Sequence, residues 1–201
     1  MLYFGGIVLN HNQSREKILL TATRLFCLRG YHATGMNQIL KESGAPKGSL
    51  YYHFPQGKEQ LAIEALTISR NLVADKLKEN FKIADPVTAV QQHLEMLAEI
   101  FSSEERLQEE WFSIVPFGLM AAESAFETEA MRKACEETFF CWEDIYIQKL
   151  KEHGYSDDMA KSLSTSLIAM IEGGIILALT QKSGQPLLQV KAIIPNLLNC
   201  K

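Results

Sequence analysis

The sequence has few of the features that mark metal-binding, disulfide-rich or secreted proteins. No two cysteines are spaced as in a CxxC motif, and the five histidines form no HExxH motif, so we expect no metal and no cofactor. The cysteines have apolar neighbours, which favours buried free thiols in a reducing cytoplasm. They are Cys27, Cys135, Cys141 and Cys200.

Leader sequences, low-complexity tracts and long apolar runs are lacking as well. The longest apolar stretch, Leu167 to Thr180, contains Glu172 and is shorter than the roughly 20 residues that a membrane span needs. No basic residue precedes Arg15 and there is no cleavage pattern, so we expect no signal peptide. These absences predict a cytoplasmic protein that does not contact a membrane, and residues 2–6 are left out of the fold prediction.

Charge is distributed unevenly along the chain. Residues 1–60 carry seven basic and three acidic residues, a net charge of +4, whereas the remainder carries 13 basic and 21 acidic residues, a net charge of −8. Hydrophobic residues make up 47% of the chain and charged residues 22%, a globular composition without signs of disorder. A basic N-terminal part followed by an acidic remainder is expected if only the N-terminal part contacts the phosphates of a nucleic acid. The alternative is chance, because the seven basic residues are spread out and form no dense patch.

The hydrophobic periodicity is helical throughout, and no stretch alternates for long enough to predict a strand. We therefore expect an all-α fold of about nine helices, without repeats and without a linker between domains. The predicted helices span approximately residues 14–29, 36–42, 46–54, 58–81, 86–101, 117–125, 127–153, 157–181 and 187–198.

Several helix ends are marked by capping residues. Ser14 and Thr34 are candidate caps for the first two helices. Ser156, followed by two aspartates, strongly predicts a helix start, because acids there interact well with the helix dipole. Gly30 and Gly154 are expected to end helices.

Two short helices joined by a tight turn at Gly44 form a helix-turn-helix pattern between Gly30 and Lys58. We expect residues 12–58 to form the DNA-binding domain and residues 59–201 a ligand-binding and dimerisation domain. A recognition helix presents its N-terminal residues to base edges in the major groove. Lys47 can donate to guanine, and a cation there opposes the helix dipole, which suggests a use other than stability.

Other residues of this segment leave alternatives open. We expect one of Tyr51 and Tyr52 to pack inward, and the sequence does not say which. His53 either contacts phosphate or closes the turn before Pro55. Lys58 either contacts phosphate or is an ordinary solvated lysine.

These residues resemble the DNA-binding signature of the TetR family of repressors. The matching segments are GYHAT at 30–34, SGAPKGSLYYHF at 43–54 and KEQL at 58–61. Within the family, FGLMAAES at 117–124 and MIEGGI at 170–175 are similar to the C-terminal domain of the LmrA/YxaF-type regulators. The resemblance covers nearly the whole chain, most strongly over residues 14–66.

The resemblance implies three helices for DNA, about six for ligand and dimer, and a set of DNA contacts. The chain departs from the family at Gly35, where a hydroxyl residue is usual, which affects a phosphate contact and the cap of the second helix. The implied DNA contacts are Thr34, Asn37, Lys47, Gly48, Ser49, Tyr51, Tyr52, His53 and Lys58.

Bulky side chains in the C-terminal part are candidates for a ligand pocket. Such residues at helical spacing are more often core, but an all-helical domain rich in them can enclose an apolar cavity with a few polar anchors. Glu172 and Glu123 are the candidate anchors, each with a surface position as the alternative. The resemblance implies an aromatic or drug-like effector. The candidates are Trp111, Phe112, Phe117, Met120, Glu123, Trp142, Met170 and Glu172.

The last two predicted helices are candidates for a dimer interface. The run from Leu167 to Leu179 is apolar nearly all round, which is typical of a buried helix. Paired with residues 187–198 across a twofold axis, it would form a four-helix interface, which agrees with the dimers of the family.

Together these features predict a repressor that a small molecule releases from an inverted-repeat operator. An enzyme is the weaker alternative, because residues 44–49 resemble a phosphate loop only superficially and no strand precedes them. A helix-turn-helix that binds proteins is the other alternative, against which the basic N-terminal part argues.

Overall fold

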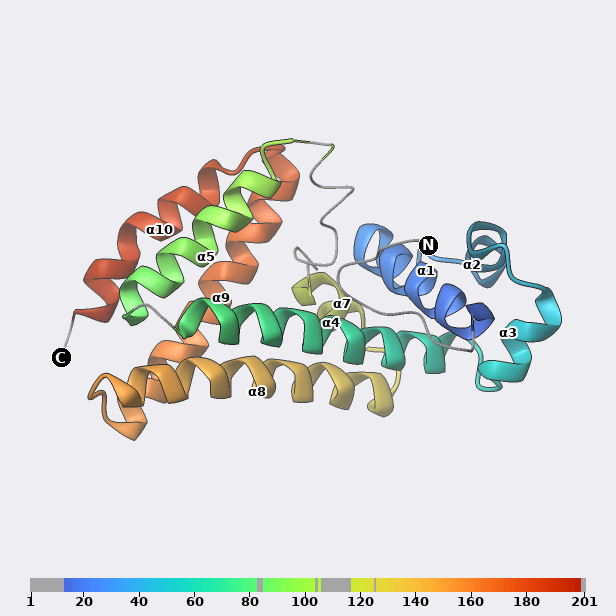
Figure 1. Ribbon diagram of the computed structural model, residues 1–201, viewed down its shortest axis with the longest axis horizontal. Helices are drawn as coiled ribbons and strands as arrows, with labels where there is room; N and C mark the ends of the chain where they lie inside the picture. The colour runs from blue at the N-terminus through green and yellow to red at the C-terminus, as the bar shows by residue number, and fades with distance from the viewer. Residues whose placement is uncertain (1–12, 83–84, 104, 106–116, 125, 200–201) are drawn as a thin grey trace. The chain divides into compact units, whose positions relative to one another are not determined.

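The computed structural model describes residues 13–82, 85–103, 105, 117–124 and 126–199, and all regular structure among them is α-helical (Figure 1). This confirms the predicted all-α class. The helices are α1 (Gln13–Arg29), α2 (Met36–Ser43), α3 (Lys47–His53), α4 (Lys58–Phe81), α5 (Pro86–Ile100), α7 (Phe117–Ser124), α8 (Glu129–Glu152), α9 (Asp157–Gln181) and α10 (Gln185–Leu198).

Contacts divide the described residues into two compact units. The N-terminal unit comprises residues 13–69 together with Leu119–Glu136, and the C-terminal unit comprises the described parts of 70–118 and of 137–199. Helices α4, α7 and α8 each contribute to both units. The predicted boundary lay after residue 58. The first turns of α4 instead belong with the N-terminal unit by contact, and their buried residues are Leu61, Ala62, Ala65 and Leu66.

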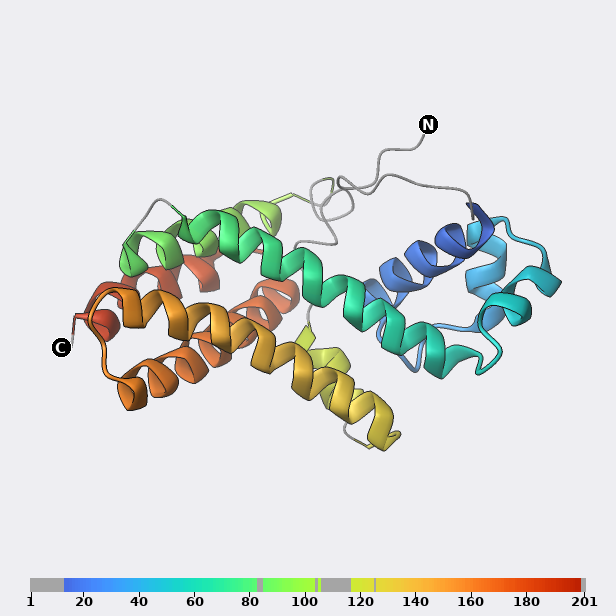
Figure 2. The same cartoon turned by 60° about the horizontal axis from the view of Figure 1, so that its bottom comes forward.

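The core of the N-terminal unit forms where α1 packs against α2 and α3 (Figure 2). The apolar face of α1 is buried, and it consists of Ile18, Ala22, Leu25, Phe26 and Cys27. Helix α2 contributes Ile39 to this core and α3 contributes Leu50, both without exposed surface. Helices α1, α2 and α3 thus share one small core, which fixes the orientation of α3.

The turn between α2 and α3 depends on Gly44. Its φ of +64° is left-handed, a conformation that costs an L-residue with a Cβ about 1–2 kcal/mol, and its N–H donates to Leu40 O. At the other end of α2 the cap residue is Gly35, which makes no side-chain capping bond, so the predicted Thr34 cap is wrong. Ser14 lies inside α1 rather than at its cap.

The C-terminal unit contains two sets of packed helices. Helices α5, α9 and α10 pack together, and α5 lies alongside α10 in both views (Figures 1 and 2). The second half of α4 packs against α8. Here Lys149 Nζ donates to Phe81 O at 2.6 Å, and the Phe81 and Tyr146 rings meet edge to face at 5.2 Å.

Helix starts in this unit follow the capping pattern of the sequence. Ser156 Oγ accepts from Met159 N, and Asp157 and Asp158 occupy the first turn of α9, as predicted. Asp85 caps α5 by accepting from Val87 N and Thr88 N. Helix α10 begins at Gln185, two residues earlier than expected, because Pro186 fits the first helical turn.

Helix α9 is long and apolar enough to cross a membrane by length and composition alone, a test that core helices of soluble proteins also pass. Its buried residues include Leu167, Ile171 and Ile175, and it packs on α5 and α10. Other apolar residues on α9, Met159, Ile176, Leu177 and Leu179, are exposed. The helix therefore has a buried side in the core and an exposed side on which several large apolar residues lie among polar ones.

Candidate DNA-binding and ligand sites

Helix α3 presents one buried and one exposed face. Leu50 and Phe54 are fully buried beneath it, while Lys47 and Gly48 are exposed at its first turn and Ser49 is partly exposed. The face that carries the basic tip is thus free of contacts with the core. This geometry is the one that a recognition helix needs to enter a groove.

Both tyrosines of α3 are exposed, 49% for Tyr51 and 82% for Tyr52. The prediction that one of them packs inward is wrong, because Leu50 already fills the core position of this short helix. The ring of the partly buried His53 lies 4.9 Å from that of Tyr52, edge to face. Two exposed aromatic hydroxyls beside a basic tip are suited to phosphate contacts.

Lys58 takes a position that neither sequence alternative described. Its Nζ lies 4.2 Å from the centroid of the Tyr31 ring, a cation–π contact. Burial lowers the pKa of Lys58. The negative charges of Glu127 and Glu123 act in the other direction and raise it, but their effect is smaller. The side chain is therefore partly engaged in holding the turn between α1 and α2 against the start of α4.

Thr34 lies in the turn between α1 and α2. It is fully buried, and its hydroxyl lies 2.9 Å from Gly30 O and 3.2 Å from Leu25 O. The hydroxyl thus satisfies carbonyl oxygens at the end of α1, and no DNA contact is proposed for this residue. Asn37, one turn further along, is exposed.

Glu123 is placed by the structure in the N-terminal unit rather than in a ligand pocket. Its Oε2 accepts a hydrogen bond of 2.5 Å from Tyr31 N. Nearby, Glu127 Oε1 lies 3.1 Å from His32 Nε2, and Thr128 Oγ1 donates to Glu59 Oε1 at 2.7 Å. We call Glu123, Glu127 and Thr128 the turn clamp, because they hold the α1–α2 turn and the start of α4. Glu123 is therefore not among the ligand-binding residues that we propose.

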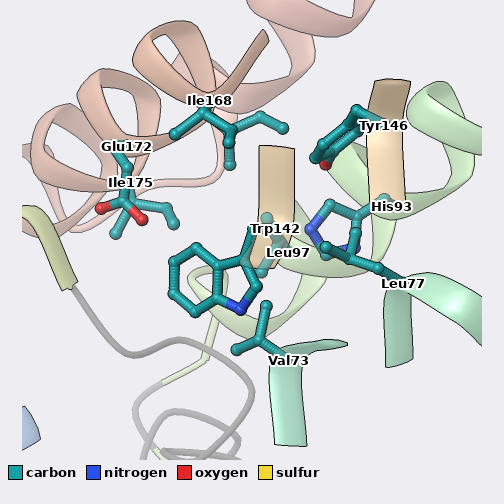
Figure 3. Close-up of a pocket in the computed structure, with 10 residues that line it drawn as sticks. Val73, Leu77, His93, Leu97, Trp142, Tyr146, Ile168, Glu172 and Ile175 are labelled. Atoms are coloured by element: carbon teal, nitrogen blue, oxygen red, sulfur yellow. The ribbon is translucent and has the colours of Figure 1, made fainter. Parts of the chain in front are cut away.

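A cavity lies inside the C-terminal unit, between α4, α5, α8 and α9 (Figure 3). Its volume, counted as the space that the centre of a water molecule can reach, is about 40 Å³. That space holds a few waters at most, because one water needs about 10–15 Å³ on this measure. The lining residues are Val73, Leu77, His93, Leu97, Trp142, Tyr146, Ile168, Ile171, Glu172 and Ile175.

The cavity brings together two of the predicted ligand residues, Trp142 and Glu172. Trp142 Nε1 donates to Arg70 O at 3.1 Å, which fixes the indole plane. Glu172 Oε2 accepts from Gly118 N at 2.9 Å. Burial nevertheless raises the pKa of Glu172 to about 7, so near neutral pH this carboxyl is about half protonated.

Two further polar groups face this cavity, His93 and Tyr146. His93 is 5% exposed, and burial together with the charge of Lys76 lowers its pKa to about 4, so its imidazole is neutral at pH 7. His93 Nδ1 has no hydrogen-bond partner among the residues that the structure describes. Burial, and to a lesser degree Glu172, raises the pKa of Tyr146 well above its usual range.

The remaining predicted ligand residues have other positions. Phe117 is buried and meets the Phe139 and Trp142 rings at 5.0 Å, so it supports the cavity wall without lining it. Met120 is buried in the N-terminal unit, and Met170 is partly buried on α9 outside the cavity lining. Trp111 and Phe112 lie outside the described residues.

Sequence reasoning missed His93 and Tyr146. The available signal for His93 was its spacing, since Val90, His93 and Leu97 recur at intervals of three and four residues and all are buried. A histidine within such an apolar stripe predicts burial. Nothing in the sequence says that its ring borders a cavity.

Family comparisons assign both parts of the chain. Residues 18–65 match the model of the tetR family of bacterial regulatory proteins, and residues 86–193 match the C-terminal domain of LmrA/YxaF-like transcriptional regulators. The Bacillus subtilis regulator LmrA is 48% identical over 94% of this chain and 99% of its own length. The B. subtilis regulator YxaF is 46% identical over 96% and 98%.

Solved structures agree on the fold. A TetR regulator from Legionella pneumophila superposes with a TM-score of 0.78 at 20% identity, covering 94% of this chain and 98% of its own. Reduced NemR from Escherichia coli gives 0.76 at 22%, covering 92% and 96%. With the exposed recognition helix, these similarities show that the chain belongs to the TetR family of transcriptional regulators, with a C-terminal domain of the LmrA/YxaF-like kind.

Proposed function

We propose that this regulator is a cytoplasmic repressor that binds an inverted-repeat operator as a homodimer and leaves it when an aromatic or drug-like molecule enters the α4–α5–α8–α9 cavity. The observation that carries the proposal is the exposed tip of α3. Lys47, Gly48 and both tyrosines are exposed, while Leu50 anchors the helix from below.

The proposed DNA contacts divide into base and phosphate contacts. Lys47, at the first turn of α3, is assigned to guanine O6 and N7, with Gly48 allowing close approach and Ser49 hydrogen-bonding nearby. Asn37, Tyr51, Tyr52 and His53 are assigned to the backbone. Lys58 adds positive charge, although its contact with Tyr31 reduces what it can give to DNA.

A homodimer through α9 and α10 is supported by their unpaired apolar surface. Ile176, Leu177 and Ile193 are 44–52% exposed, although they are large aliphatic residues. Two copies that bury these side chains against each other would form a four-helix interface with twofold symmetry. Such a dimer requires two DNA half-sites of opposite direction, about 34–36 Å apart or a multiple of that distance.

Ligand release follows from thermodynamic linkage. A molecule that binds better to the DNA-free conformation lowers the affinity of the protein for DNA. By linkage, DNA lowers the affinity of the protein for that molecule by the same factor. Such coupling is typically about 1–3 kcal/mol, or roughly 5–150-fold. The present cavity holds only a few waters, so a drug-sized ligand has to displace its walls, and this displacement is the proposed source of the coupling.

The test is footprinting on the DNA upstream of the regulator's own gene, with wild type and Lys47→Ala. We expect two symmetric protected half-sites. Lys47→Ala should lower affinity by about 1–3 kcal/mol and relax the preference at one base pair in each half-site. Protection of a single half-site would contradict the dimer, and a uniform loss over all sequences would contradict base readout by Lys47.

A further inference from the structure

One buried polar atom in the described part of the C-terminal unit lacks a hydrogen-bond partner. His93 Nδ1 belongs to a side chain that is 5% exposed, and it has no hydrogen-bond partner within the described part of the chain. Leaving a buried polar atom unpaired costs about 1–3 kcal/mol, so native proteins rarely do so without a partner that comes from outside the chain.

The orphaned atom belongs to a residue that lines the cavity. Figure 3 shows the imidazole among the cavity side chains, with Tyr146 and Trp142 as neighbours in the view and Glu172 on another helix. The rest of the lining is almost entirely aliphatic or aromatic. A molecule in this space therefore meets apolar walls and a small number of polar groups, which is the usual composition of a ligand site.

The chemistry of a neutral imidazole defines the group that fits it. One ring nitrogen donates and the other accepts, and the surroundings decide which. A hydroxyl satisfies Nδ1 in either case, because it both donates and accepts, whereas a carbonyl or an amine N–H satisfies only one tautomer. Burial and the positive charge of Lys76 keep the ring uncharged at neutral pH.

We propose that His93 is the specificity-determining residue of the ligand cavity, where Nδ1 exchanges a hydrogen bond with a hydroxyl group on an otherwise apolar molecule. This inference rests on the proposed ligand-binding function of the cavity. Without ligand, an ordered water takes the same place, since the cavity is large enough for a few waters.

The test compares two probes that differ by one hydroxyl, 2-naphthol and naphthalene. Equilibrium dialysis against the full-length protein measures the affinity for each. Wild type should bind 2-naphthol about 3- to 10-fold more tightly than naphthalene, the range that one net hydrogen bond supplies. His93→Leu should lose this preference and bind 2-naphthol no more tightly than naphthalene, because the hydroxyl then has no partner at this position.

Two further variants distinguish loss of the hydrogen bond at His93 from loss of the folded structure. His93→Gln retains a hydrogen-bonding side chain and should keep part of the preference, with thermal unfolding as the check that both His93 variants are folded. His153→Leu is the matched control, because it removes a histidine of the same unit that does not line the cavity. It should keep the full preference.

Results that contradict the role of His93 differ from results that contradict ligand release. Equal wild-type affinity for the two probes, undetectable binding of both, or an unchanged preference in His93→Leu would overturn the role of His93. Unequal binding that does not alter operator affinity would support the role of His93 and contradict ligand release in the proposed function.

Discussion

Thr34 and Asn37 lie three residues apart, yet the structure separates their roles. The Thr34 hydroxyl is buried against Leu25 O and Gly30 O, whereas Asn37 is exposed on α2. Periodicity cannot make this distinction, because Thr34 lies in the turn before α2, where no helical face is defined. Its burial comes from the way the turn folds back onto the end of α1.

Paired substitutions test this separation of roles. Thr34→Val should lower the free energy of unfolding by about 1–2 kcal/mol, since it removes the hydroxyl but keeps the shape, and leave operator affinity unchanged. Asn37→Ala should weaken operator binding with little effect on stability. Urea unfolding and DNA binding measured on both variants check the prediction, and it fails if Thr34→Val loses DNA affinity while fully folded.

The contributions of Glu172 and His93 to stability change with pH in opposite directions. Folded Glu172 keeps its proton up to about pH 7, whereas the unfolded group loses it near 4.5, so its contribution to stability falls as pH rises through this window. Folded His93 stays neutral down to about pH 4, whereas the unfolded group gains a proton near 6.5, so its contribution falls as pH drops. The two slopes partly cancel between pH 4.5 and 6.5.

Single variants should reveal each slope separately. As pH falls from 7 to 4.5, Glu172→Gln should lose about 1–3 kcal/mol more stability than wild type. The variant lacks the stabilisation that protonated Glu172 adds at low pH, so the loss caused by His93 is no longer offset. His93→Gln should gain stability over the same interval. Urea unfolding at half-unit steps of pH measures both. Parallel profiles for wild type and both variants would show that neither group titrates as described.

At the scale of the helices, the sequence was most informative where a cap or a long apolar stripe was present. Helix α4 has the predicted bounds, and α9 starts behind Ser156 as expected. The sequence was less informative about partners between elements. The pattern of α7 suggested that Glu123 points to a ligand, but its carboxylate instead accepts from Tyr31 N, 92 residues earlier. Periodicity identifies a face and does not identify what covers it.

The contact between α7 and the α1–α2 turn yields a double-mutant prediction. Gly30 has a φ of +82°, and a Cβ there would lie 2.8 Å from Glu123 Oε1. Gly30→Ala should therefore lower stability by about 1–2 kcal/mol for the left-handed backbone and further for the collision. In a Glu123→Ala background the collision is absent, so the cost of Gly30→Ala should be smaller.

Gly44→Ala is the matched control for this cycle. Gly44 also has a positive φ, but a Cβ there would meet nothing within 4 Å. Its cost should be the same in both backgrounds. Equal costs of Gly30→Ala with and without Glu123 would show that the turn clamp does not constrain this turn.

For the whole molecule, the exposed apolar surface of α9 and α10 determines the predicted assembly. Ile176→Lys and Ile193→Lys place a charge in the proposed interface, where an unpaired buried charge costs several kcal/mol. We expect the dimer dissociation constant to rise at least about tenfold, measured by analytical ultracentrifugation, and operator affinity to fall with it.

Phe140→Lys is the comparison, because Phe140 is also a large exposed apolar residue, 61% exposed, but lies on α8 outside the proposed interface. It should leave the dimer intact. Dissociation by Phe140→Lys, or an unaffected dimer in both isoleucine variants, would place the interface elsewhere.

The small cavity at His93 also has a mechanical meaning. Unfolding eliminates internal voids, so the unfolded chain occupies less volume and hydrostatic pressure favours it. The space lined by His93 and Trp142, of which one water at His93 fills only a part, contributes such a void, and a molecule that fills it completely removes this contribution to the volume difference. The ligand-free regulator should thus be more easily unfolded by pressure than the liganded one, and the volume change on unfolding becomes a measure of cavity occupancy that requires neither DNA nor a fluorescent ligand.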